Sequence, residues 1–304
     1  MNCSLIDTIG NTPIVRVSLP GTPAIFAKLE YRNPSGSIKD RTAMYMVEQA
    51  EAMGQLKPGG TIVESSSGNQ GIALAMIGAA KGYRVIITVS EKVSDEKLST
   101  LKAYGAQVIV CPVTSTVEDP RGYYQKAKQI ARATAGAVML DQFFNRKNPE
   151  AHYHGLGPEI WEQTNGRVTH FFAAAGTGGT VSGAGKFLKE QNPAIKIIAV
   201  DAATSFNATH GHPKPYKLEG VGIDFDTPCL DRTVIDDIVP VSDEDGIAML
   251  KILSRKYGLL VGPSSGAVAY AAKQYCRNNN LVDGVIIMIF GDSGRAYLSK
   301  GYYD

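Results

Sequence analysis

An α/β fold with parallel-rich sheets and helices on both faces is predicted by the alternation of two kinds of segment. Several short runs are apolar and rich in β-branched residues, without a polar position at every second residue, as in strands buried on both faces. Helical patterns with ordinary start and stop signals lie between them. Hydrophobic residues make up 44% of the chain, which is enough for a sizeable core. Together, these observations favour an ordered, doubly wound α/β protein.

The predicted strands share an apolar, β-branched composition over four to seven residues, and each one is followed by a glycine-rich or polar stretch. In chain order they are Thr61–Glu64, Tyr83–Val89, Gln107–Val110, Val168–Ala174, Ile195–Asp201 and Val285–Phe290. Since helical patterns connect them, we expect most of them to pair in parallel.

The predicted helices are marked by their boundaries and their apolar faces. The first has one apolar face and ends near Gly54, and the second is rich in Ala, Leu, Ile and Met and ends at Gly82. The third opens with Ser-Asp-Glu, has apolar residues at helical spacing and ends at Gly105. In order these helices are Arg41–Ala52, Gly71–Lys81 and Ser94–Tyr104, and two more are predicted at Asp119–Ala133 and Asp243–Tyr257.

Length and charge exclude several classes of protein. The 304 residues fit one large or two ordinary domains, and a net charge of +2 gives no electrostatic footprint for nucleic acid or an anionic membrane. There is no apolar run of 18 residues, and Met1–Ile9 has no basic region and carries Asp7, so neither a membrane span nor a signal peptide is expected. A cytoplasmic location is therefore predicted.

The cysteines and histidines do not indicate a metal site. The cysteines are far apart and form no Cys-x-x-Cys motif, so reduced, buried thiols are predicted for Cys3, Cys111, Cys229 and Cys276. The two His-x-His pairs, at 152–154 and 210–212, have no carboxylate or cysteine partner at ligand spacing. We therefore predict no metal.

Lys39 lies in the run NPSGSIKDR, residues 33–41, where a Pro-Ser-Gly turn delivers it just before a helix that begins near Asp40. The partial positive charge of a helix N-terminus disfavours a protonated lysine, and a neutral amine is the reactive form. Taken alone, the residue would be read as an ordinary surface lysine at a turn.

The run ESSSGNQG, residues 64–71, lies between a strand and a helix. Its consecutive hydroxyls, its backbone N–H groups and the helix N-terminus suit a carboxylate. An ordinary helix cap with extra serines is an equally good reading of this motif alone.

The run GTGGT, residues 176–180, follows an apolar strand. Its glycines let backbone N–H groups converge on a phosphate, and its threonines add hydroxyl donors. Val181 breaks the dinucleotide-binding pattern, and Thr180 and Phe187 break the P-loop pattern, so the motif predicts a phosphate site of neither nucleotide class. A tight strand-to-helix turn is the alternative.

The run GPSSG, residues 262–266, precedes the helical run Ala267–Cys276. Its hydroxyls face a ligand or cap that helix, and capping is the better interpretation of this motif by itself.

In combination, PSGSIKDR, SSGNQG, GTGGT and GPSSGA resemble, in this order, the motifs of the fold-type II pyridoxal-phosphate enzymes, whose fold is like that of the tryptophan synthase β subunit. The closest groups look like cysteine synthase and cystathionine β-synthase. The resemblance begins at GNTP, residues 10–13, and covers nearly the whole chain. It implies two twisted, parallel-rich sheets, with a larger cofactor-binding domain (1–40 plus 146–304) and a smaller, mobile, substrate-closing domain (41–145).

The resemblance also implies roles for individual residues. Lys39 matches the lysine that carries pyridoxal 5'-phosphate and acts as the catalytic base. Asn69 matches the asparagine that binds the pyridoxal 3'-oxygen, and Ser264 matches the serine that contacts the pyridine nitrogen. The phosphate-binding loop of the family corresponds to Gly176, Thr177, Gly178, Gly179 and Thr180. The substrate-binding residues match as Ser66, Ser67, Gln70, Gln142 and Glu219. Relatives commonly have threonine at positions 66 and 70, where this chain has serine and glutamine.

The activity implied is the β-replacement of L-serine or O-acetylserine by a thiol. Three stretches, residues 118–124, 219–225 and 292–300, look more like cystathionine β-synthase, which uses homocysteine, whereas Phe143 and Ile223 replace tyrosines found in some of those enzymes. The chain begins at the catalytic core and ends at Asp304, so a short, unregulated form is expected. Cysteine synthase, which uses sulfide, is the alternative, and a non-catalytic, partner-binding scaffold is a third possibility. A homodimer is expected from the family.

Overall fold

A computed structural model describes residues 4–66, 68–114 and 116–304 of the chain. They form two compact units. The smaller unit comprises Asn33–Lys147 and the N-terminal residues through Ile9, and the larger unit comprises Gly10–Arg32 and Asn148–Asp304. These divisions differ from the predicted domain boundaries at the N-terminal residues through Ile9 and at residues 33–40, all of which fall in the smaller unit. Residues 33–40 do so because their turn leads directly into its first helix. The predicted roles of the two domains stay predictions.

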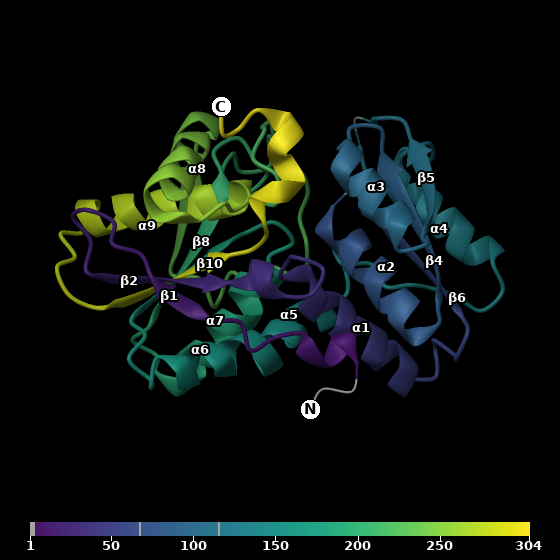
Figure 1. Ribbon diagram of the computed structural model, residues 1–304, viewed down its shortest axis with the longest axis horizontal. Helices are drawn as coiled ribbons and strands as arrows, with labels where there is room; N and C mark the ends of the chain where they lie inside the picture. The colour runs from purple at the N-terminus through teal and green to yellow at the C-terminus, as the bar shows by residue number, and fades with distance from the viewer. Residues whose placement is uncertain (1–3, 67, 115) are drawn as a thin grey trace. The chain divides into compact units, whose positions relative to one another are not determined.

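The larger unit is built on a six-stranded sheet in the order β1-β2-β10-β7-β8-β9, in which β1 is antiparallel to β2 and the other pairings are parallel. Helices α8 and α9 cover one face, and α6 and α7 lie on the other (Figure 1). The strands are β1 (Ile14–Arg16), β2 (Ala24–Leu29), β7 (His170–Ala174), β8 (Lys196–Ala202), β9 (Asp237–Val241) and β10 (Val285–Phe290). The helices are η2 (Glu30–Arg32), α5 (Lys147–Ala151, which begins at the unit boundary), η3 (His152–Leu156), α6 (Gly157–Gln163), α7 (Gly179–Gln191), α8 (Asp243–Tyr257), α9 (Pro263–Asn278) and η4 (Gly294–Lys300).

The smaller unit has a four-stranded parallel sheet in the order β5-β4-β3-β6. Side chains alternate between its faces: Ile62 and Ile87 join the core beneath α1 and α2, whereas Val63 and Ile86 pack with Ala127 of α4 on the opposite face. Its elements are η1 (Leu5–Thr8), α1 (Lys39–Ala52), β3 (Thr61–Ser65), α2 (Asn69–Lys81), β4 (Arg84–Ser90), α3 (Asp95–Ala103), β5 (Gln107–Cys111), α4 (Tyr123–Ala133) and β6 (Ala137–Met139).

The predicted fold class is confirmed, and each predicted strand and helix corresponds to an observed one. The largest boundary error is in α4, which begins at Tyr123 rather than Asp119. Residues 119–122 form a turn instead, in which Gly122 donates its N–H to the Asp119 carbonyl at 3.0 Å, and Arg121 pairs with the Asp119 carboxylate at 2.8 Å. The hydrogen bond and the ion pair of this turn use backbone and side-chain groups that would otherwise lie in the first turn of the helix.

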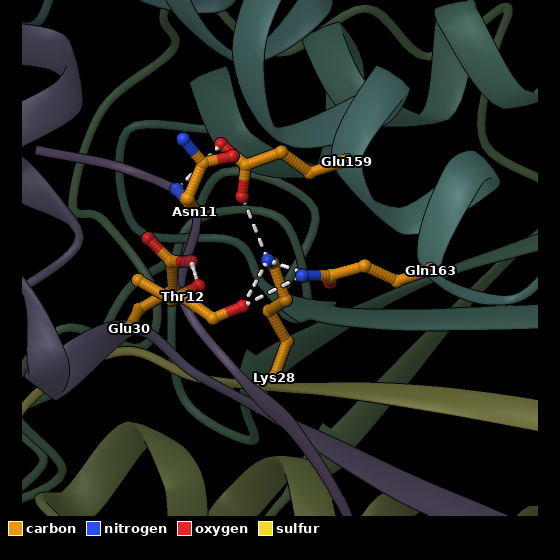
Figure 2. A network of polar contacts seen from close by, with 6 residues as sticks. All are labelled: Asn11, Thr12, Lys28, Glu30, Glu159 and Gln163. Atoms are coloured by element: carbon orange, nitrogen blue, oxygen red, sulfur yellow. Dashed lines mark hydrogen bonds and ion pairs between the residues drawn. The ribbon is translucent and has the colours of Figure 1, made fainter.

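A buried lysine anchors the GNTP segment to the larger unit. Lys28 of β2 is fully buried, and its ammonium donates to the Thr12 carbonyl at 2.7 Å, to Glu159 Oε2 at 2.7 Å and to Gln163 Oε1 at 2.9 Å (Figure 2). Glu159 Oε1 also accepts the backbone N–H of Asn11 at 3.0 Å, so α6 and the chain start are joined through one charge pair. Burying an ammonium is costly unless it is paired and fully hydrogen-bonded, and here it is both.

Membrane-spanning helices and metal-binding clusters are absent from the described residues, and the cysteines among them are buried. No described helix is long and apolar enough to cross a membrane. Within the described ranges, no three His, Cys, Asp or Glu side chains gather in a way that would hold a metal ion. Cys111, Cys229 and Cys276 are buried thiols, and Cys3 lies outside the described residues.

Candidate active site

The predicted site residues divide between the two units. The smaller unit contains Lys39 and the stretches around Asn69 and Gln142, and the larger unit contains the GTGGT loop, Glu219 and Ser264. Each half is described by itself below.

Lys39 is the first residue of α1 and is half-buried. Its backbone N–H donates to Ser37 Oγ at 3.2 Å. The buried carboxylate of Asp40 reaches back across the turn, where its Oδ2 accepts the Ser35 N–H at 2.7 Å and its Oδ1 accepts the Ser35 hydroxyl. Gly36 supplies the left-handed backbone of the turn, with φ of +91°. The predicted delivery of Lys39 by a fixed turn at a helix start is therefore what the structure has.

The serine loop leads from β3 to α2, and its described serines, Ser65 and Ser66, do not cap the helix. Gly68 is the N-cap of α2, and no side chain makes a cap hydrogen bond there. Ser66 is buried and its Oγ accepts the Gly68 N–H at 3.3 Å, while Ser67 lies outside the described residues. The capping interpretation of this motif is therefore wrong for the two described serines.

Gln70 differs from an ordinary core side chain. It is 1% exposed, and neither Oε1 nor Nε2 has a hydrogen-bond partner within the described part of the chain. A buried polar group left without a partner costs about 1–3 kcal/mol. Such an amide in the first turn of α2 is suited to a ligand oxygen, in keeping with the predicted carboxylate site.

Gln142 is buried in the turn that follows β6, and the carboxyl group of Glu64 holds its backbone. Glu64 Oε1 accepts the Gln142 N–H at 3.2 Å, and Oε2 accepts the Asp141 N–H at 2.8 Å. Burial raises the pKa of Glu64 to about 8 despite these hydrogen bonds. Motif reading did not single out Glu64, although an acidic residue within an otherwise apolar strand is a visible signal.

The GTGGT loop joins β7 to α7. Gly178 is the N-cap of α7 in the left-handed conformation, with φ of +84°. The backbone N–H groups of Gly176, Thr177 and Gly178 find no acceptor among the described residues. They stand at the start of a 13-residue helix, the arrangement that binds phosphate. These unpaired N–H groups favour the phosphate-site interpretation of the loop over that of a tight strand-to-helix turn.

Two residues of the preceding helical segment fix the threonines of this loop. Asn148 is buried and donates from Nδ2 to Thr177 Oγ1 at 2.9 Å, and a Cβ at Gly179 would lie 2.0 Å from Asn148 Oδ1. His152, also buried, lies with Nε2 3.3 Å from Thr180 Oγ1. Sequence reasoning considered His152 for a metal and missed Asn148. Their spacing of four residues, which places them on one helix face, was the available signal.

Ser264 lies in the first turn of α9, whose N-cap is Gly262 without a side-chain cap bond. Its hydroxyl has no hydrogen-bond partner in the part of the chain that the structure describes. The capping interpretation of GPSSG is therefore wrong for Ser264. A Cβ at Gly220 would lie 3.9 Å from Ser264 Oγ, and one at Gly176 would lie 3.1 Å from the Gly220 carbonyl oxygen. The phosphate loop, the Glu219–Gly220 segment and Ser264 are thus brought together within the larger unit.

Glu219 forms an ion pair. Its Oε1 lies 3.7 Å from Lys300 Nζ, and both side chains are about one-third exposed. An ion pair this long and this exposed contributes little to stability.

Comparisons with known proteins identify the family of the chain. A family model described as pyridoxal-phosphate dependent enzyme matches residues 5–292. Cystathionine β-synthase of Saccharomyces cerevisiae is 44% identical over 98% of this chain and 62% of its own length, so the chain spans about three-fifths of that relative. A cysteine synthase of Staphylococcus aureus is 39% identical, over 99% of this chain and 96% of that protein. The crystal structure of the O-acetylserine-dependent cystathionine β-synthase of Helicobacter pylori superposes with a TM-score of 0.91 at 38% identity, covering all of this chain and 99% of that one.

The chain therefore belongs to the pyridoxal-phosphate-dependent enzyme family, and pyridoxal phosphate is its cofactor. The residues present fit this group. A loop with three backbone N–H groups at a helix start suits the phosphate, and the Ser264 hydroxyl suits a ring nitrogen. Lys39 is delivered by a fixed turn.

Proposed function

We propose that the protein catalyses the β-replacement of L-serine or O-acetylserine by homocysteine to give cystathionine. The observation that carries this proposal is the polar but uncharged group at Ser264, beside the phosphate loop. When bound, pyridoxal phosphate acts as an electron sink that acidifies the Cα proton of an amino acid. A hydroxyl at the ring nitrogen keeps this sink weaker than a carboxylate would, which favours loss of a β-substituent over transamination.

The chain's own residues then have separate tasks. Lys39 would hold the cofactor, and its amine would accept the Cα proton of the donor amino acid as general base. Asn69 binds the cofactor's 3'-oxygen, and residues 176–180 bind its phosphate. Ser66, Ser67, Gln70 and Gln142 bind the donor carboxylate. The buried, unmatched amide of Gln70 supports that assignment.

The Glu219–Lys300 pair favours homocysteine over sulfide as the acceptor. Homocysteine is a zwitterion, and opposite charges 3.7 Å apart complement its ammonium and carboxylate groups. Sulfide offers neither group. Cysteine synthesis from O-acetylserine and sulfide is the second candidate, favoured by the likeness to the S. aureus cysteine synthase over almost its full length. We further propose a cytoplasmic homodimer; complete catalytic motifs argue against a role as a non-catalytic scaffold.

A product assay tests the proposal. Purified enzyme is incubated with L-serine or O-acetylserine, each with homocysteine or sulfide, and the products are separated by mass spectrometry. Cystathionine as the main product at equal acceptor concentrations supports the proposal. Cysteine as the main product supports the second candidate, and no amino-acid product with any pair overturns both.

A further inference from the structure

Glu64 is a buried carboxyl group that joins the two stretches proposed to bind the donor carboxylate. It lies near the end of β3, immediately before the serine loop, and is 0% exposed. Its two oxygens accept the backbone N–H groups of Asp141 and Gln142 at 2.8 and 3.2 Å. One side chain therefore ties the Gln142 turn to the strand from which the serine loop emerges.

The turn that Glu64 holds is strained. Asp141 has φ of +57°, a left-handed conformation that costs a residue with a Cβ and persists only where its surroundings fix it. The two hydrogen bonds to Glu64 supply part of that fixation. They require two acceptor oxygens on one side chain, which a carboxyl group offers in either protonation state and an amide does not.

The ionisable groups around Glu64 are mostly acidic. Asp141 Oδ2 accepts the Tyr124 hydroxyl of α4 at 2.9 Å, whereas Asp141 Oδ1 is buried without a partner among the described residues. The Nζ atom of Lys128 in α4 lies 4.6 Å from the centre of the Tyr124 ring, and its charge lowers the pKa of Asp141 against the larger, opposite effect of burial. Strand β6 contributes no ionisable residue, and the basic residues of β4 and α2 lie at the ends of those elements remote from Glu64.

From this geometry we infer that Glu64 is a positioning residue, which sets Gln142 relative to the serine loop and makes donor binding sensitive to pH. The inference rests on the proposed function, since it assumes that Gln142 and the loop bind the donor carboxylate. Because both Glu64 oxygens accept backbone N–H groups, we expect its effect to fall on donor binding rather than on the chemical step.

The direction of the pH effect follows from the environment. Burial, with a smaller contribution from the Asp141 charge, raises the pKa of Glu64 from 4.5 to about 8. The folded state therefore favours the neutral acid. The contribution of the Glu64 carboxyl group to the free energy of unfolding is therefore complete below pH 4.5 and is lost as the pH rises to about 8. Above that pH, a negative charge beside Gln142 opposes the donor carboxylate.

Steady-state kinetics of the full enzyme between pH 6.5 and 9.5 test the inference. The donor is the one that the product assay identifies, at saturating acceptor. At pH 7, Glu64→Gln should raise the donor KM roughly tenfold, the loss of about one hydrogen bond, with kcat within about twofold. The wild-type donor KM should rise further above pH 8, and Glu64→Gln should lack that inflection. Glu64→Asp, which keeps both oxygens, should retain the inflection.

Two controls separate positioning from a general loss of structure. Asp141→Asn keeps a side chain that tolerates the left-handed backbone but removes the neighbouring charge, so it should move the inflection to lower pH. Glu51→Gln changes a carboxylate of the same unit that pairs with Lys81 and should leave the donor KM unchanged. A donor KM of Glu64→Gln within twofold of wild type, or an inflection that persists in it, would overturn the inference. A wild-type enzyme that makes no product would instead overturn the proposed function, and this inference with it.

Discussion

Replacing Gly178 by alanine tests whether the phosphate loop depends on a bare backbone. With φ of +84°, any residue with a Cβ pays about 1–2 kcal/mol at this position. The new Cβ would also lie 2.6 Å from Leu230 Cβ and 2.7 Å from Leu230 Cα. Because one of these atoms belongs to the backbone, a change of the Leu230 rotamer cannot remove the collision, and overpacking of this kind costs about 1–3 kcal/mol. The free energy of unfolding should fall by about 2–5 kcal/mol in total.

Gly258→Ala is the matched control. Gly258 ends α8 in the same unit with φ of +68°, and a Cβ there would meet no atom within 4 Å, so only the backbone cost of about 1–2 kcal/mol applies. Urea unfolding of both apoproteins and absorbance titration with pyridoxal phosphate give the two readouts. We expect Gly178→Ala to be less stable than the control and to bind the cofactor at least tenfold more weakly than wild type, while the control binds it normally. Equal stability and equal cofactor affinity in the two variants would refute the reasoning.

Three further changes are expected to act on separate parts of the site and its scaffold. Lys28→Met should lower the free energy of unfolding in urea by about 3–5 kcal/mol, because it strands the partly buried Glu159 carboxylate; a loss under about 1 kcal/mol would show that the pair is unimportant. Ser264→Asp should protonate the ring nitrogen and alter both the visible spectrum and the ratio of products, and an unchanged spectrum and β-replacement rate would argue against a contact there. Glu219→Gln should raise the KM for homocysteine roughly fivefold, equivalent to about 1 kcal/mol, and barely change the KM for sulfide; kinetics that shift equally with both acceptors would contradict a recognition role for the Glu219–Lys300 pair.

The buried parallel strands could be predicted because their apolar runs are continuous. Strand β2 was not predicted because Lys28 interrupts its apolar pattern. Burial of this lysine depends on the tertiary hydrogen bonds and ion pair around its ammonium group. Strand β9 was hidden by Asp237 and Pro240, which are tolerated because it is an edge strand. Strands β1 and β6 have three residues each, too few for a period to appear.

The site motifs could be located from sequence, but their surroundings could not. Asn148 and His152 act on loop threonines that lie about 30 residues along the chain, and the contact exists only once the segments fold together. Likewise, Glu64 acts on a turn 77 residues away. Motif reading also overestimated serine capping, because glycines occupy the N-cap positions of both α2 and α9 and leave the hydroxyl of Ser264 for other contacts.

The central claim, that Lys39 carries the cofactor of a β-replacement enzyme, is tested most directly by locating the modified lysine. Borohydride fixes the pyridoxyl group on the lysine that holds it, and peptide mass spectrometry of the digested, full-length holoenzyme then identifies that residue. The account predicts the added mass on the peptide that contains Lys39, and no stable labelling or turnover in Lys39→Ala. A pyridoxyl group on any other lysine, or a Lys39→Ala enzyme that keeps its visible absorbance and rate, would contradict it.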